Sequence, residues 1–386
     1  MKKFKSHKFK ELKIRQMKIR ALHQILFSFI LLGSAITASA QYEFTDLQNL
    51  PCQAIQDQGK TGTCWSFATT SFLESELKRI HDLDVNLSEM YAVRMIYKEK
   101  ARNYLLRQGV AGFSQGALAH DLIRVAREYG AIPEKAYSGK LKKGKGHDHG
   151  ELETGMKGYL DAILKKKPLS DKWPIVIDDM MDAYLGHVPD TVLWGDKFYT
   201  PASFFKEYPL PFDNYLALTS FSHHPFYSSF ILEIPDNFSN GSFFNVPVNE
   251  LYEATLEAVR KGYSVAWDGD VSEDGFNARK GLAVMAKDGK YPQAFKAPGE
   301  EMKADQKTRQ EFFESLTTTD DHLMHIVGVA KDQNGNNYFI VKNSWGEIGP
   351  YNGVLYMSEA YFKLKTVSVH FHENALNKAM KKKWGL

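Results

Sequence analysis

Apolar side chains recur at helical spacing through the first third of the chain. Behind a glycine-rich turn, segment 64–83 carries them three or four positions apart, which predicts an amphipathic helix. A second helix is predicted over 86–106, since Asn-Leu-Ser-Glu at its beginning is typical of a helix start. A third, over 117–129, is expected to end at Gly130, because glycine readily adopts the conformation that closes a helix. This part of the chain is therefore predicted to be mainly helical.

The last third of the chain consists of short apolar runs separated by turns. A helix over 251–261 leads into an apolar strand at 264–267. Farther on, the runs 322–330 and 337–343 flank Asn-Gly-Asn at 334–336, which is the pattern of a β-hairpin. The pattern predicts a β-rich region that follows the helical one.

Between these two regions the hydrophobic pattern is weaker. Residues 140–150 are polar and rich in glycine, which is typical of a mobile loop, and the next stretch mixes short helices with proline-rich connections. We therefore expect an α+β protein. Its predicted parts are a helical lobe at 41–150, a mixed insertion at 151–244, and a β-rich lobe with a C-terminal tail at 245–386.

The first 40 residues have a composition of their own. Nine Lys and Arg residues against one acidic residue precede an apolar run at 25–36, and Ala-Ser-Ala follows at 38–40. This order is typical of a secretory signal peptide, and the apolar run is too short to span a bilayer comfortably. We expect cleavage near Ala40, export to the periplasm or the extracellular space, and no stable membrane anchor afterwards.

The net charge changes sign once this leader is set aside. The whole chain carries +3 and the leader 9 − 1 = +8, so the remainder carries 3 − 8 = −5. The basic character thus belongs to the export signal, and composition gives no support to nucleic-acid binding.

Two cysteines are present, Cys52 and Cys64, which is too few for the disulfide scaffold of small exported domains. Cys52 is expected to be unpaired. A disulfide between Cys52 and Cys64 is the alternative, and it would silence the chemistry that the surroundings of Cys64 indicate.

Cys64 stands where the glycine-rich turn enters the first helix. A thiol becomes a good nucleophile when it loses its proton, and a helix N-terminus favours the thiolate. Gln58 lies on the same turn, six residues earlier, and its side-chain amide could join the backbone N–H of Cys64 in an oxyanion hole. Cys64 is therefore the candidate nucleophile.

The predicted hairpin supplies a partner for this thiol. His322 begins one of its strands, and Asn343 ends the other. Strand pairing brings such positions together, so Asn343 can hold the imidazole of His322 in the required tautomer, while Trp345 shields that hydrogen bond from water. His325 is a second candidate, but it lies three residues farther on and faces the other side of the strand.

These residues resemble the papain family of cysteine peptidases. Within that family the chain most resembles the bleomycin hydrolase and aminopeptidase C branch, over roughly residues 56–371. The stretches that carry the resemblance are Gln58 with Cys64-Trp65, Leu87-Ser88-Glu89, Tyr129-Gly130-Ala131-Ile132-Pro133, Thr200-Pro201-Ala202-Ser203-Phe204-Phe205, Ala266-Trp267-Asp268-Gly269-Asp270-Val271, Asp321-His322 and Asn343-Ser344-Trp345-Gly346.

The resemblance implies a papain-like two-lobed fold, with a helical left lobe and an antiparallel, β-barrel-like right lobe. It also implies hydrolysis of peptide bonds in peptides or proteins through a thioester acyl-enzyme, with neither a metal nor another cofactor. In the family a small residue follows the catalytic histidine six positions later. Gly328 stands there after His322, whereas Lys331 follows His325, so His322 is favoured. The resembled branch forms hexamers, so a homo-oligomer is a partner that the resemblance suggests.

Two features depart from the branch. Its paired glycines, which bind the substrate backbone in the non-primed subsites, align with Gly116-Ala117, so Ala117 is expected to add a methyl group at the cleft wall. Aminopeptidases of this branch end in an arm that enters the cleft, and the end at Leu386 is expected to fall short of that arm. The tail is expected to form a short basic helix docked on the surface. Overall resemblance favours aminopeptidase-like cleavage, and an endopeptidase with an open cleft is the alternative.

Other readings of the chain are weaker. Gly-Phe-Ser-Gln-Gly around Ser114 matches a serine hydrolase elbow, but that elbow needs a buried strand before it, and a helix end is predicted there. His147 with His149, and His223-His224, could bind a metal, although a polar loop and a turn are the favoured contexts. A catalytically inactive binding module is the non-enzyme alternative, and the four intact catalytic positions argue against it.

Overall fold

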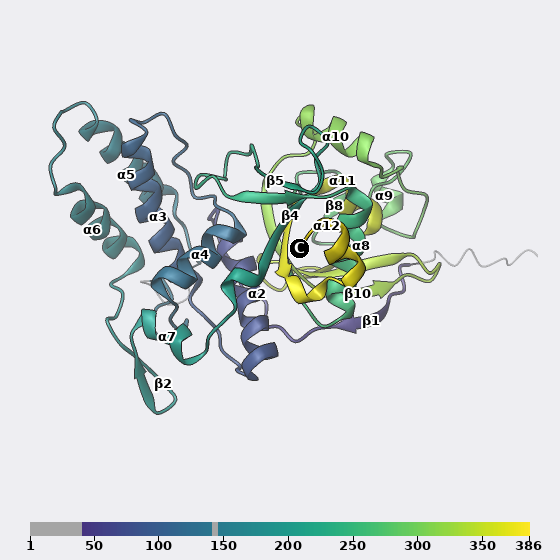
Figure 1. Cartoon of the computed structure of the whole chain (residues 1–386), viewed down its shortest axis with the longest axis horizontal. Coiled ribbons are helices and arrows are strands. Elements are labelled where there is room, and N and C mark those ends of the chain that lie inside the picture. Colours follow the sequence, from purple (N-terminus) through teal and green to yellow (C-terminus); the bar gives the residue numbers. More distant parts are fainter. Residues whose placement is uncertain (1–40, 141–145) are drawn as a thin grey trace, which may run out of the picture. The chain divides into compact units, whose positions relative to one another are not determined.

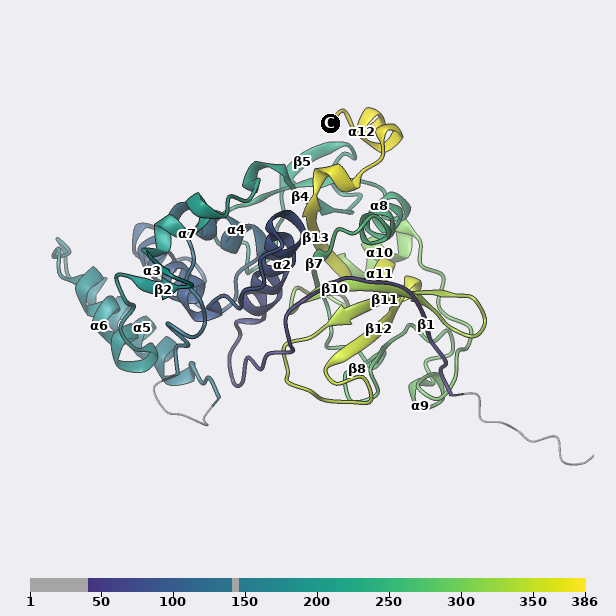
Figure 2. The same cartoon turned by 90° about the horizontal axis from the view of Figure 1, so that it is seen from below.

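The computed structural model describes residues 41–140 and 146–386. Residues 42–386 belong to one compact unit. The expected signal peptide and its cleavage position lie outside the described residues. Within the unit, a group of helices gathers at one end and a large sheet at the other (Figure 1), and helix α2 (Cys64–His81) lies between them (Figure 2).

Three long helices form the core of the helical part: α2, α3 (Glu89–Leu106) and α4 (Ala119–Tyr129). They confirm the three expected helices, with ends shifted by a few residues. Ser88 caps α3 by accepting a hydrogen bond from a backbone N–H of the first turn. Gly130, with a φ of 83°, ends α4. Helix α2 is buried from its first residue to Leu77, because it packs against α3 and α4 on one side and against strand β10 on the other.

One mixed sheet forms the other part. Its strands follow the order β5-β6-β4-β13-β7-β10-β11-β12-β9-β8, and β1 pairs with β10. The strands are β1 (Thr45–Asn49), β4 (Tyr215–Thr219), β5 (Ser228–Ile231), β6 (Ser242–Asn245), β7 (Val265–Gly269), β8 (Phe276–Asn277), β9 (Leu282–Ala283), β10 (His322–Lys331), β11 (Asn337–Lys342), β12 (Val354–Ser358) and β13 (Thr366–His372).

The hairpin formed by β10 and β11 confirms the hairpin expected from the sequence. Its turn is held by Asp332, whose carboxylate accepts the backbone N–H groups of Asn334 and Asn336 at 2.9 and 2.8 Å. Gly335 adopts a φ of 84°, which a glycine tolerates without strain. On its other side β10 pairs with β7, and His322 lies opposite Gly269.

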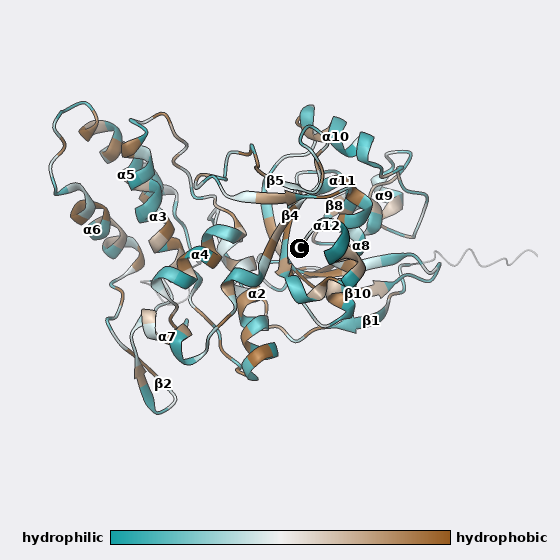
Figure 3. Cartoon of the chain, viewed as in Figure 1, coloured by the Kyte–Doolittle hydropathy of each residue, from teal (hydrophilic) through white to brown (hydrophobic). Residues whose placement is uncertain are grey.

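The middle stretch of the chain contributes to both parts. Helices α5 (Gly150–Ile163) and α6 (Trp173–Leu185) pack on α3, while β4 extends the sheet by pairing with β13. Helix α6 buries Ile177, Met181 and Leu185, which recur every four positions, and Figure 3 shows hydrophobic residues on α6 and along the inner strands. The remaining elements are β2 (Val192–Trp194), β3 (Lys197–Tyr199), α7 (Pro201–Glu207), η1 (Phe212–Asn214), α8 (Val248–Arg260), α9 (Tyr291–Ala294), α10 (Gln306–Glu314), α11 (Glu359–Lys365), η2 (Glu373–Ala375) and α12 (Lys378–Trp384).

The tail forms the expected short basic helix, α12, which docks on α8. The indole N–H of Trp384 donates to Glu250 Oε2 at 2.8 Å, and the ammonium group of Lys383 donates to Glu250 Oε1 at the same distance. Trp384 is buried, so apolar contact adds to these bonds. As for membranes, none of the helices in the described ranges is both long and apolar enough to cross a bilayer.

Candidate active site

Cys64 is the first residue of α2 and lies at the junction of the helices and the sheet. Its side chain is 8% exposed, and its thiol lies against the backbone N–H of Leu323, the second residue of β10. Both cysteines are free: Cys52 is exposed and Cys64 is buried, so the disulfide alternative is wrong. The fold therefore brings the candidate nucleophile to the strand that carries the candidate histidine.

His322 and Asn343 meet through a direct hydrogen bond. His322 Nε2 lies 2.8 Å from Asn343 Oδ1, and both side chains are buried. The same Oδ1 accepts the backbone N–H of Ser344 at 2.7 Å, which fixes the orientation of the amide. The indole ring of Trp345 lies over the imidazole, with ring centroids 4.7 Å apart and a tilt of 36°. Together these contacts hold the imidazole in one orientation.

His325 has different surroundings, although it lies on the same strand. Its side chain is fully buried, and Nδ1 lies 2.9 Å from the hydroxyl of Ser71, two turns along α2 from Cys64. The ammonium group of Lys342 donates to the same hydroxyl at 2.9 Å. Burial, together with the charge of Lys342, lowers the pKa of His325 well below its ordinary value. These contacts give His325 a structural environment between α2 and the hairpin.

Gln58 connects the turn before Cys64 to the segment that follows Asn343. Its side-chain amide donates to the carbonyl oxygen of Thr61 at 2.7 Å, and its Oε1 accepts the hydroxyl of Ser344 at 2.6 Å. Its backbone N–H donates to the carbonyl oxygen of Ser344 at 2.9 Å. A side-chain amide has two N–H groups, so one remains for a ligand after Thr61 is satisfied. The backbone N–H of Cys64 belongs to the first turn of α2, where amides have no acceptor within the helix.

Burial controls the charge state of the two reacting groups. It raises the pKa of Cys64 to about 12, and nearby acidic groups act in the same direction. It lowers the pKa of His322 to about 4, and the hydrogen bond that His322 donates to Asn343 Oδ1 opposes this shift. Both shifts favour an uncharged resting pair at neutral pH. Transfer of the thiol proton to His322 creates both charges at once, and the N-terminus of α2 stabilises the thiolate that results.

Four aspartates lie around this pair, and sequence analysis assigned them no role. The carboxyl groups of Asp268 and Asp320 share a hydrogen bond, and burial raises the pKa of both, that of Asp320 to about 7. Asp321 accepts the backbone N–H of Val271 at 2.9 Å, and burial raises its pKa to about 6. Asp268, Asp320 and Asp236 are the acidic groups that act on the thiol of Cys64. These acidic groups favour a cationic ligand near the thiol.

The two residues aligned with the paired glycines lie in different surroundings. Gly116 is half-buried, and the carboxylate of Asp236 covers it. Ala117 is 1% exposed and belongs to the hydrophobic core of the helical part. The expectation that its methyl group lies at the cleft wall is therefore wrong, because the side chain points into the core. The serine hydrolase alternative also fails, since α3 precedes the exposed Ser114 where an elbow requires a strand.

His147 and His149 are buried, in contrast to the expected polar loop. The backbone of His147 accepts the N–H of Lys60 at 2.8 Å, and a side chain on Gly59 would collide with it at 2.5 Å. Nδ1 of His149 lies 3.0 Å from the hydroxyl of Tyr97. Burial lowers the pKa of His147 to about 3 and that of His149 to about 4. Both residues support the turn that carries Gln58, and composition alone gave no sign of this packing.

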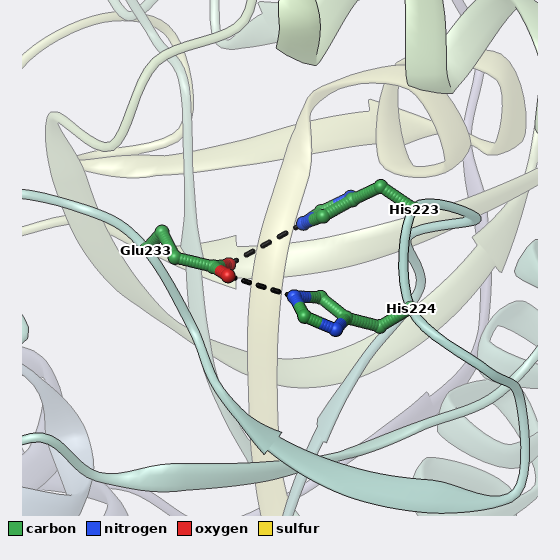
Figure 4. A group of neighbouring side chains, drawn as sticks. All are labelled: His223, His224 and Glu233. Carbon is green, nitrogen blue, oxygen red and sulfur yellow. Dashed lines mark hydrogen bonds and ion pairs between the residues drawn. The ribbon is translucent and has the colours of Figure 1, made fainter.

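His223 and His224 meet Glu233 in an exposed cluster (Figure 4). His223 Nε2 lies 3.3 Å from one carboxylate oxygen of Glu233, and His224 Nε2 lies 2.7 Å from the other. The side-chain amide of Gln310 is 2.9 Å from Nδ1 of His223 and can donate to it, so that Nε2 carries the proton given to Glu233. Hydrogen bonds thus account for the arrangement.

Comparison with known proteins defines the class of this chain. A model of the Peptidase C1-like family matches residues 191–385, and a model of the papain family of cysteine proteases matches residues 39–143. The chain belongs to the Peptidase C1-like family and is a cysteine-type peptidase. This confirms the resemblance stated from the sequence.

Individual relatives agree with this class. Aminopeptidase G of Lactobacillus delbrueckii subsp. lactis is 24% identical over 85% of this chain and 83% of its own length. Bleomycin hydrolase of Mus musculus is 21% identical, over 86% of this chain and 83% of its own. The crystal structure of PepW from Lactobacillus rhamnosis superimposes with a TM-score of 0.69 at 18% identity, covering 92% of this chain and 89% of PepW. The papain-like α+β fold is confirmed.

Proposed function

We propose that Cys64 is the nucleophile of this peptidase and that His322, oriented by Asn343, is its acid/base partner. The hydrogen bond of 2.8 Å between His322 Nε2 and Asn343 Oδ1 carries the proposal. It engages one nitrogen of the imidazole and leaves Nδ1 to exchange a proton with the thiol. Trp345 covers this bond and keeps the imidazole from turning.

The reaction proceeds in two steps. Nδ1 of His322 takes the thiol proton while Sγ of Cys64 attacks the carbonyl carbon of the scissile bond. The backbone N–H of Cys64 and the free amide N–H of Gln58 stabilise the oxyanion. His322 then returns the proton to the leaving amine, and a thioester remains on Cys64. Water, deprotonated by His322, attacks the thioester and releases the acid, and the proton restores the thiol.

We further propose that the enzyme removes residues from the N-terminus of peptides, after export from the cytoplasm. Aminopeptidase G, one of the relatives, supports the mode of cleavage. The basic and apolar leader before residue 41 supports export. The alternative mode is internal cleavage by an open cleft.

A labelling experiment tests the catalytic assignment. The protein is treated with a thiol-directed epoxide probe, and the modified residue is identified by mass spectrometry. We expect Cys64 to be labelled and peptide hydrolysis to be lost in parallel, while the exposed Cys52 reacts only slowly. Hydrolysis that persists after complete labelling of Cys64 would refute the assignment, and an unreactive Cys64 with no hydrolysis would indicate a binding module.

A second experiment tests the mode of cleavage. One peptide is offered with a free and with an acetylated N-terminus, and the cut positions are mapped by mass spectrometry. We expect stepwise loss of residues from the free peptide and slow cleavage of the acetylated one. Equal internal cleavage of both peptides would establish the endopeptidase alternative.

A further inference from the structure

The loop between β5 and β6, residues 232–241, joins the sheet to the helical part of the molecule. It starts and ends on paired strands at the edge of the sheet. Its far side contacts two helices: the hydroxyl of Ser239 lies 3.0 Å from Nε2 of His120 on α4, and the ring of Phe238 lies 5.3 Å from the ammonium group of Lys100 on α3. A side chain on Gly241 would collide with the ring of His120, so the loop is in close contact with α4.

Asn237 gives this loop a fixed shape. Its side-chain N–H groups donate to the carbonyl oxygens of Leu232 and Gly241 at 2.9 and 3.0 Å, and its Oδ1 accepts the backbone N–H of Gly241 at 2.7 Å. These bonds tie the two ends of the loop together. Asn237 is 7% exposed and Leu232 is 1% exposed, so the base of the loop is buried. The neighbouring residue Asp236 is therefore held in place by a rigid loop.

Asp236 contacts two segments near the active site, one at Gly116 and one at Asp320. Its carboxylate covers Gly116, since a Cβ atom built on that glycine would lie 1.8 Å from Asp236 Oδ2. The hydroxyl of Ser114 contacts the same carboxylate. Its backbone N–H faces the carboxyl group of Asp320, which precedes His322 by two residues. Asp236 is also one of the acidic groups that act on the thiol of Cys64. It therefore lies over the glycine that aligns with the substrate-binding pair, within electrostatic reach of the nucleophile.

The negative charge at this place is only partly compensated. The charge of Lys100 acts on Asp236, but its ammonium group already contacts the carbonyl oxygen of Gly116 and lies 3.3 Å from the hydroxyl of Ser114. Asp268, which is 1% exposed, and Asp320 share their hydrogen bond. In the described residues, no amide, hydroxyl or cation donates to Asp268 Oδ1 or to Asp320 Oδ2. The two carboxyl groups therefore depend on each other for their hydrogen bond, and a ligand with several N–H groups would supply additional donors.

We propose that Asp236 binds the protonated α-amino group of the peptide substrate and thereby restricts cleavage to the first peptide bond. This inference rests on the proposed cysteine peptidase function. An ammonium group has three donors, which can be shared between the carboxylate of Asp236 and the carboxyl pair of Asp268 and Asp320. The loop that carries Asp236 lies over Gly116, which aligns with the substrate-binding glycines of the resembled branch. In this proposal, a substrate chain that continues past its first residue meets the carboxylate at Gly116. A Lys or Arg side chain has the same cationic chemistry and is the competing ligand.

The experiment compares Asp236→Asn with a matched control in the same loop, Glu233→Gln. Both variants lose one negative charge, but Glu233 is exposed and contacts His223 and His224 instead of Gly116. Three coumarylamide substrates are hydrolysed by wild type and variants: leucyl, N-acetyl-leucyl and N-acetyl-lysyl-leucyl. Alkylation of Cys64 by iodoacetamide, which needs no substrate subsite, is measured in parallel.

We expect Asp236→Asn to lower kcat/KM for the leucyl substrate by about 10- to 100-fold, mostly through KM, because a hydrogen bond to a charged group is lost. Hydrolysis of the acetylated substrates and alkylation of Cys64 should change little, and Glu233→Gln should resemble wild type.

Equal loss on the leucyl and acetyl-leucyl substrates, or no loss at all, would overturn the inference while Cys64 remains reactive. A loss confined to the acetyl-lysyl-leucyl substrate would assign Asp236 to a basic side chain and overturn it as well. A wild-type protein that hydrolyses none of the three would refute the proposed function, and the inference with it.

Discussion

The molecule contains two hairpins that reach the active site, and they differ in how they are built. The β10–β11 hairpin has a short turn held by Asp332 and Gly335; β10 begins at His322, and Asn343 directly follows the end of β11. The β5–β6 hairpin has a ten-residue loop, 232–241, whose shape depends on the buried side chain of Asn237. The first hairpin carries the proposed catalytic pair, and the second carries the proposed binding group for the substrate amine.

In these proposals the β10–β11 hairpin serves the chemical step, and the β5–β6 hairpin serves the selection of the substrate. His322 is the first residue of β10, where it pairs with Gly269 of β7, and Asn343 follows the last residue of β11. Strand pairing on both sides of β10 therefore positions the two residues that form the 2.8 Å bond. Asp236 is positioned by contacts between a loop and two distant segments, at Gly116 and Asp320. Changes in the first hairpin should therefore affect every substrate, whereas changes around the second should affect only substrates with a free amine.

The largest expected effect is in the first hairpin. His322→Ala should lower kcat by about 10⁴-fold or more on free and acetylated substrates alike, because the thiol of Cys64 loses its base. His325→Ala, on the same strand, is the control. It should keep most of the activity and instead lose about 1–3 kcal/mol of stability, because the bond to Ser71 disappears from a buried site. Steady-state kinetics and thermal unfolding measure the two effects. An inactive His325→Ala beside an active His322→Ala would reverse the assignment.

The next effect concerns the oxyanion. Gln58→Ala should lower kcat by about 10²–10³-fold with little change in KM, because one donor to the developing charge is lost. Gln115→Ala is a matched control, since its side chain also binds the turn, accepting the N–H of Gly62 at 2.8 Å. Gln115→Ala should lower kcat by about tenfold or less, because it removes a side chain that supports the turn and not a hydrogen-bond donor to the oxyanion. An unchanged kcat in Gln58→Ala would remove Gln58 from the mechanism.

The first hairpin could be predicted from the sequence, and the second could not. Asn-Gly-Asn between two apolar runs is a local signal, and strand pairing then implies the meeting of His322 with Asn343. Nothing local indicates that Asp236 covers Gly116, because that contact joins segments far apart in the chain. The burial of His147 was missed for a similar reason, since a segment rich in Lys and Gly is typical of a solvated loop. Long-range packing overrides composition at both places.

A smaller effect tests the second hairpin by steric means. In Gly116→Ala the new methyl group would lie 1.8 Å from Asp236 Oδ2, so the carboxylate must swing away. We expect the preference for free over acetylated substrates to fall about tenfold, through the lost contact with the amine. Gly112→Ala is the control, because a Cβ atom there meets no atom within 4 Å. The ratio of kcat/KM for the two substrates is the measurement, and an unchanged ratio in Gly116→Ala would contradict the placement of Asp236.

The smallest effect concerns the pH dependence of the alkylation rates of the two thiols. Alkylation of Cys64 needs neutral His322, whose pKa burial lowers to about 4, so its rate should fall only as the pH drops through about 4. In the described part of the chain no base is hydrogen-bonded to Cys52. Although the residue is exposed, partial desolvation of its thiol raises its pKa above the ordinary value, so its alkylation should require alkaline pH. The hydrogen bond with Asn343 raises the pKa of His322, so Asn343→Ala should move the acid limit of Cys64 to lower pH, with partial activity retained. The rate of iodoacetamide labelling at each cysteine, followed by mass spectrometry, measures the pH limit for Cys64, for Cys52, and for Cys64 in Asn343→Ala. If alkylation of Cys64 required the same alkaline pH as alkylation of Cys52, His322 would not act as the base. The β10–β11 hairpin would then have no catalytic role to set against the binding role of the β5–β6 hairpin.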